Sequence, residues 1–137
     1  MGATQVTVAV SNPADPGRRW EALFLVDTGS IDCYVPAARL REIGIPPVGR
    51  RTYELADGTE IALEVGVAQV EFMGEVVGAT VIFGRDDAEP LLGVTALESV
   101  GIEIDPQNQR LKRLPAVRLK ALVPAKVASS GPSPPAP

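Results

Sequence analysis

The stretch over residues 51–84, RTYELADGTEIALEVGVAQVEFMGEVVGATVIFG, constrains the fold more than any other part of the chain. It is rich in Val, Ile and Thr, which are typical of strands, and two turn signals interrupt it, ADGT at 56–59 and MGE at 73–75. This pattern predicts consecutive strands joined by tight turns. We therefore expect a mainly β protein.

The remaining segments fit the same class. Residues 4–10 and 20–27 predict two strands joined by the turn SNPADPGRR, and residues 91–93, 102–105 and 110–114 predict further short strands. Short helices are expected at 37–44 and 94–101, each ending at a glycine. The 137 residues are enough for one domain, which we place at 1–123, and the Pro-rich tail at 124–137 is expected to be disordered.

The chain contains no histidine, and this excludes large classes of chemistry. Ser-His and Cys-His nucleophiles, an imidazole general base and most zinc sites all need that side chain. The one cysteine, Cys33, cannot form an intrachain disulfide, and its strand-forming neighbours suggest a place in the core. Any catalysis must therefore use carboxylates, hydroxyls or lysine.

Charge and hydropathy limit the kinds of partner that the chain is expected to bind. No stretch resembles a signal peptide or a membrane span, so we expect a soluble, cytoplasmic protein without membrane contact. The net charge is −4, and the basic residues that follow Asp105 lack interleaved aromatic residues. Nucleic-acid binding is not indicated. The basic segment is expected to lie on the protein's own acidic surface, with an arm for an acidic partner as the alternative.

One carboxylate stands out. Asp27 follows five apolar residues, ALFLV, and precedes a Thr-Gly-Ser turn. Burying an unpaired ionised carboxylate is costly unless the group takes up a proton or gains hydrogen-bond donors. Its position therefore calls for a structural or chemical reason.

The segment FLVDTGS at 24–30 resembles the catalytic signature of aspartic proteases. An apolar strand and a helix follow it, then a hairpin with glycine at its tip, and then LLG followed by a second helix. In this order the motifs resemble the single-domain, retroviral-type proteases (retropepsins) and their bacterial and archaeal relatives. The resemblance covers about residues 4–114 and implies an all-β acid protease fold, a closed β-barrel with one lobe per chain and a short C-terminal helix after the LLG strand.

The resemblance also implies a reaction. A chain with one Asp-Thr-Gly motif obtains its second carboxylate from a symmetry mate, so we expect a C2 homodimer that hydrolyses peptide bonds with two Asp27 side chains. In the family, Thr28 bonds across the twofold axis and Gly29 lets backbone N–H groups approach the carboxylate. A hydroxyl at Ser30 can donate to the ionised Asp27 carboxylate, which predicts an acidic pH optimum.

Other site residues follow from the same resemblance. The flap that closes over substrate is expected at the hairpin tip, and the second apolar-apolar-glycine element at LLG. No cofactor or metal is implied, and the expected substrates are extended peptides with hydrophobic side chains. The flap residues are Ala56, Asp57, Gly58 and Thr59, and the second element consists of Leu91, Leu92 and Gly93.

The chain also departs from the family pattern. Retroviral enzymes usually carry an intrachain ion pair at the positions of Ile31 and Val94, and both are apolar here, a coherent exchange. We interpret Asp32 as a turn or subsite residue and Trp20 as a core or interface residue. The main alternative to a protease is a catalytically silent dimer of the same fold that serves as a binding or scaffolding module. A phosphatase-like aspartate nucleophile and a β-module without chemistry are weaker alternatives.

Overall fold

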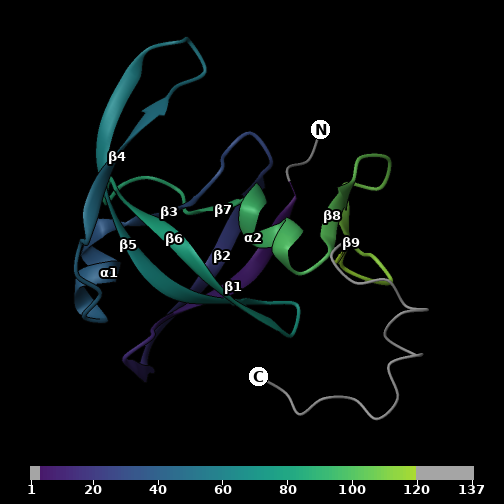
Figure 1. Cartoon of the computed structure of the whole chain (residues 1–137), viewed down its shortest axis with the longest axis horizontal. Coiled ribbons are helices and arrows are strands. Elements are labelled where there is room, and N and C mark those ends of the chain that lie inside the picture. Colours follow the sequence, from purple (N-terminus) through teal and green to yellow (C-terminus); the bar gives the residue numbers. More distant parts are fainter. Residues whose placement is uncertain (1–3, 120–137) are drawn as a thin grey trace, which may run out of the picture.

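The computed structural model describes residues 4–119, which form nine strands and two short helices (Figure 1). Both helices begin directly after a strand, as the sequence predicted, and Gly44 and Gly101 follow them with φ values of +80° and +71°. The tail expected to be disordered lies outside the described residues. The elements are β1 (Gln5–Asn12), β2 (Asp15–Asp27), β3 (Cys33–Pro36), α1 (Ala37–Glu42), β4 (Gly49–Glu54), β5 (Glu60–Phe72), β6 (Glu75–Gly84), β7 (Leu91–Gly93), α2 (Val94–Ser99), β8 (Ile102–Asp105) and β9 (Arg110–Arg113).

Seven strands form one sheet in the order β1-β2-β7-β3-β6-β5-β4. Strand β1 also pairs with β5, so six of these strands close into a ring and β4 is attached to its outside. Most neighbours run antiparallel, whereas β2–β7 and β3–β6 are parallel. The expected closed all-β architecture is confirmed.

The first hairpin is longer than the sequence suggested. We expected the second strand to begin at Trp20, but β2 begins at Asp15, which pairs with Asn12. The Asn12 side chain accepts a hydrogen bond from the Ala14 N–H at 2.8 Å, so two residues suffice for the turn. The polar residues that looked like a loop therefore continue the strand pairing.

The interior of the ring is filled mainly by aliphatic side chains, and the aromatic residues Phe24 and Phe72 are its largest fully buried members. Trp20 packs at the edge of this core, with its ring centroid 5.9 Å from that of Phe24. The Arg39 guanidinium lies over the outer part of Trp20, 5.7 Å from the ring centroid. Trp20 is thus a core-edge residue, as expected.

Cys33 is fully enclosed by this core, with 1% of its surface exposed. Burial raises the pKa of its thiol from 9.0 to about 11. Because the thiolate is the reactive form, we expect native protein at about pH 8 to react with an aromatic disulfide reagent only as it unfolds. The raised pKa keeps the folded thiol protonated at pH 8, so the reactivity of the native protein should increase only as the pH approaches 11. Measuring the rate with and without denaturant checks this, and equal rates would contradict the burial.

Strands β8 and β9 form a separate two-stranded sheet beside α2, at the right of Figure 1. Arg113 ties this hairpin to the turn between β5 and β6, because its guanidinium pairs with Glu75 and donates to the Met73 carbonyl at 2.7 Å. Lys112 lies 3.8 Å from Glu103 within the hairpin. The described part of the basic segment therefore contacts the protein's own carboxylates. Neither helix among residues 4–119 has the length and hydrophobicity needed to cross a membrane.

Candidate active site

Asp27 is the last residue of β2, at the end of the parallel pair that β2 forms with β7. Residues 25–26 pair with Leu91 and Leu92, and Asp27 pairs with Gly93. The apolar run thus places the aspartate beside the second glycine element. In the single chain the Asp27 side chain is partly buried.

Two local donors hold the Asp27 carboxylate. The Gly29 N–H donates to Oδ1 at 2.9 Å, and the Ser30 hydroxyl donates to Oδ2 at 3.0 Å. The Ser30 N–H also bonds to the Asp27 carbonyl at 3.1 Å, which closes the turn. Both carboxylate oxygens therefore have a partner within their own loop.

Gly93 lets this loop pack directly on β7. A Cβ atom at this position would lie 2.6 Å from the Asp32 carbonyl oxygen and 2.8 Å from that of Ile31. Beyond it, the Val94 N–H donates to the Ser30 carbonyl at 2.7 Å and the Thr95 N–H to the Ile31 carbonyl at 3.3 Å. The loop after Asp27 is therefore fixed through its backbone by the start of α2.

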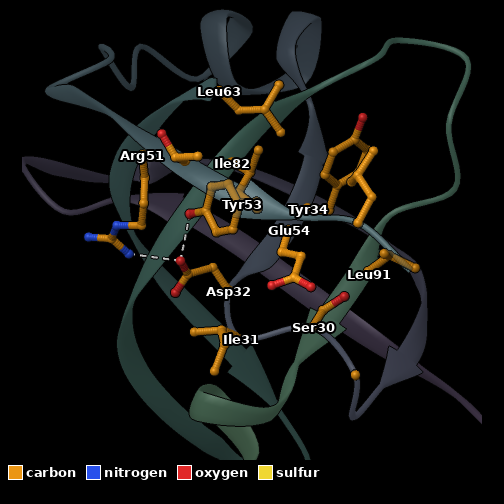
Figure 2. Close-up of a pocket in the computed structure, with 13 residues that line it drawn as sticks. Ser30, Ile31, Asp32, Tyr34, Arg51, Tyr53, Glu54, Leu63, Ile82 and Leu91 are labelled. Carbon is orange, nitrogen blue, oxygen red and sulfur yellow. Dashed lines mark hydrogen bonds and ion pairs between the residues drawn. The ribbon is translucent and has the colours of Figure 1, made fainter. Parts of the chain in front are cut away.

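A pocket of about 610 Å³ opens beside the loop, between it and the strand β4 (Figure 2). Its wall is mainly apolar, with Ser30, Asp32, Arg51, Thr52 and Glu54 as the polar side chains. Ile31 is 60% exposed and contributes to this wall, so the apolar residue at that position covers a pocket surface and not the core. The apolar lining residues are Ile31, Tyr34, Tyr53, Leu55, Leu63, Ile82 and Leu91.

Asp32 joins the loop to β4. Its Oδ2 accepts a hydrogen bond from the Tyr53 hydroxyl at 2.6 Å and forms an ion pair with Arg51 Nη1 at 2.8 Å. These are the two dashed contacts in Figure 2. Burial, followed by the bond to Asp32, raises the pKa of Tyr53 to about 12, and the bond to Asp32 raises the pKa of Arg51. Both partners therefore keep their protons over the whole physiological range.

The expected flap is the hairpin of β4 and β5, which projects from the strand ring (Figure 1). Residues Ala56, Asp57, Gly58 and Thr59 form its tip, are exposed and do not line the pocket, whereas Thr52 to Leu55 do. The Thr59 hydroxyl donates to the Asp57 carboxylate at 2.7 Å and lowers its pKa. Gly58 has φ +88°, which the turn requires.

Thr28 lies on another side of the loop. It is exposed and borders a groove of about 390 Å³ between α2 and β8. The groove also includes Leu97, Ile102 and Ile104, so its floor is largely apolar. Thr28 therefore faces away from the pocket that Ser30 lines.

The structure brings Asp27, Gly29, Ser30 and Gly93 together, places Leu91 in the pocket wall and buries Leu92 below it. The four residues of the flap tip are not part of the pocket lining. Neither Arg51 nor Tyr53 was predicted from the sequence to be a pocket residue. Their alternation in β4 places both on one face, but no local signal shows that Asp32 lies opposite. Within residues 4–119, no group of three or more Cys, Asp or Glu side chains is arranged to hold a metal ion.

No protein-family model and no curated protein matches the chain. Solved structures do match. The EIAV protease, in complex with the inhibitor HBY-793, is similar with a TM-score of 0.51 and 16% identity, covering 75% of this chain and 92% of that one. The solution structure of the Simian Foamy Virus (mac) protease gives a TM-score of 0.45 and 18% identity, covering 65% and 86%. At these identities the likeness is one of fold.

Proposed function

Because this chain has the retropepsin-like fold of the retroviral proteases, we propose that it is a homodimeric aspartic endopeptidase. The observation that carries the proposal is the Asp27 carboxylate, held by Gly29 and Ser30 beside a largely apolar pocket. The other carboxylate of the loop, Asp32, is bound to Arg51 and Tyr53 and is not free to act. One chain thus offers one reactive carboxylate, and a second copy supplies the other.

The reaction needs the two carboxylates to share one proton. The ionised Asp27 removes a proton from water, whose oxygen attacks the peptide carbonyl, while the protonated Asp27 of the other chain donates to the carbonyl oxygen. Transfer of a proton to the nitrogen then breaks the C–N bond and releases an amine and a carboxylic acid. The Gly29 N–H and the Ser30 hydroxyl each bind one oxygen of Asp27 and hold the carboxylate in a fixed orientation for these proton transfers.

The proposed dimer interface lies on the side of the loop that carries Thr28. Thr28 and the groove between α2 and β8 are exposed in the single chain, next to a hairpin that pairs with no other described strand. An isolated two-stranded sheet is only marginally stable in water. A second copy packed here would cover the apolar groove and bring the two Asp27 loops together around a twofold axis.

Substrate recognition is proposed for the pocket and the β4–β5 hairpin. Apolar side chains of an extended peptide fit the wall formed by Tyr34, Leu63, Ile82 and Leu91. Closure of the hairpin over the peptide would supply backbone hydrogen bonds from its tip, and Gly58 gives that turn its left-handed conformation. The substrate class is therefore an unfolded or extended polypeptide.

The pH dependence of kcat/KM tests this proposal. We expect a bell-shaped profile between about pH 3 and pH 8, because the singly protonated pair is the competent species. Ser30→Ala removes a donor to the charged form, so the limb at higher pH should move toward neutral. Ser11→Ala, in β1 and outside the pocket, is the matched control and should leave the profile unchanged.

Two results would count against the proposal. A flat pH profile would rule out catalysis by a pair of carboxylates. Sedimentation that shows only monomer in the presence of a peptide-like inhibitor would mean that no second Asp27 carboxylate is available. An unmoved limb in Ser30→Ala would reject only the role given to the serine. A dimer that binds peptides and never cleaves them would favour a catalytically silent module.

A further inference from the structure

Asp32 is the only charged side chain among residues 4–119 that is buried, with 7% of its surface exposed. It also lines the candidate pocket. An ionised carboxylate in such a place is costly unless its charge is compensated. The groups that compensate this charge therefore also determine the charge of the pocket near Asp32.

The compensation comes from β4 and not from the loop that carries Asp32. Arg51 lies 2.8 Å from Asp32 Oδ2 and is itself 51% exposed, and the Tyr53 hydroxyl lies 2.6 Å from the same oxygen. Arg51 pairs across the sheet with Leu63, and Arg51, Tyr53 and Leu63 all line the pocket. The end of the pocket near Asp32 therefore has one negative and one positive group in contact, and no net charge.

The remaining charged group of the pocket lies elsewhere. Glu54 is exposed and lines the pocket, and in Figure 2 its carboxylate lies toward Ser30, away from Arg51. Solvent screens such a group far more than a buried one. It therefore leaves the local balance between Asp32 and Arg51 intact.

We infer that Arg51 is a specificity-determining residue, which neutralises Asp32 so that the pocket accepts uncharged side chains and rejects charged ones. The inference rests on the proposed peptidase function and names a substrate class for the same site. A lysine of the peptide placed here meets the guanidinium and finds Asp32 already occupied. A glutamate of the peptide meets the Asp32 carboxylate and finds Arg51 already paired. At this end of the pocket, away from Glu54, either charge would lose water without gaining a free partner.

The test compares matched peptides on the full-length protein. In a cleaved peptide, each position near the scissile bond is made Met or Lys in turn, and kcat/KM is measured for each. Wild type should prefer Met at the position that enters this pocket. Arg51→Met leaves Asp32 with only Tyr53, so the preference should shift toward Lys by at least about tenfold, as expected for a hydrogen bond to a charged group.

A neighbouring arginine provides the control. Arg50 is in the same strand and has the same charge, but it lies on the other face, donates to the Ala62 carbonyl at 3.2 Å and does not line the pocket. Arg50→Met should keep the wild-type ratio of Met to Lys peptides. A change caused only by the net charge of the protein would appear in both variants.

The reciprocal variant protects the test against a folding defect. Asp32→Asn keeps the shape of the side chain and leaves the Arg51 guanidinium uncompensated. With peptides that carry Gln or Glu at the same position, this variant should shift toward Glu, again by about tenfold. A structural defect would lower cleavage of both peptides together and leave their ratio unchanged.

The outcomes are separable. If wild type cleaves peptides in an Asp27-dependent manner and neither variant changes its ratio, the inference about Arg51 is wrong and the proposed function stands. If wild type cleaves no peptide at any pH, both are overturned. Opposite shifts in the two variants, with none in Arg50→Met, would establish the inference.

Discussion

Asp27→Asn should lower kcat/KM for peptide cleavage by roughly 10²–10⁴-fold, because each chain then loses the carboxylate proposed to transfer the proton. Asparagine has the shape of aspartate: its amide oxygen can accept the hydrogen bond from the Gly29 N–H, and the Ser30 hydroxyl can rotate to accept one from the amide NH2. The amide cannot take a proton from water at these pH values. The fold should therefore persist while the reaction stops.

The measurement is kcat/KM at the pH optimum of wild type, together with thermal unfolding and sedimentation of both proteins. Asp15→Asn is the matched control, since Asp15 begins the same strand and is exposed. That variant should cleave at the wild-type rate. An Asp27→Asn protein that still cleaves peptides, free of contaminating protease, would exclude the aspartic mechanism.

Gly93→Ala should lower the free energy of unfolding by about 3 kcal/mol and abolish cleavage, because its Cβ cannot be accommodated. The atoms in its way are the Asp32 carbonyl at 2.6 Å and the Ile31 carbonyl at 2.8 Å, which are backbone and cannot rotate aside. Relief requires the loop to leave β7. That movement would break the bonds from Val94 and Thr95 and shift Asp27 itself.

The comparison for this substitution is Gly78→Ala. Gly78 lies in β6, no atom stands within 4 Å of its Cβ position, and its backbone needs no left-handed conformation. Alanine there should be neutral or slightly stabilising, because glycine costs more conformational entropy on folding. Denaturant unfolding of the two variants gives the difference directly. Similar stability for both would show that the loop does not depend on close packing at Gly93.

Local chemistry made much of the fold predictable. Turns at Gly44, Gly58 and Gly101 need a left-handed conformation, and each marks the end of a helix or the tip of a hairpin that the sequence placed correctly. The sequence motifs around Asp27 and at Leu91–Gly93 likewise predicted the two strands, β2 and β7, whose pairing builds the site. Such features are readable because neighbours in the sequence determine them.

The unpredicted features depend on residues that are distant in the sequence. A closed sheet was expected, but the pairing of β1 with β5 that closes it, and the contact of Asp32 with Arg51 and Tyr53, result from the packing of separate hairpins. An exposed strand arginine and a pocket arginine look alike in the sequence, as Arg50 and Arg51 show. The two are distinguished only by the strand register, in which Arg50 lies opposite Glu64 and Arg51 opposite Leu63.

The parallel pairing of β2 with β7 has a consequence for the order of folding events. It joins Leu25 and Leu91, which are separated by more than half of the described chain, and such long-range pairing is slow because a large loop must close first. During synthesis the Asp27 loop has nothing to pack against until Gly93 has been made. The nascent chain would therefore carry its carboxylate in a mobile, unassembled form, and any activity would appear only after the last strands of the ring have joined.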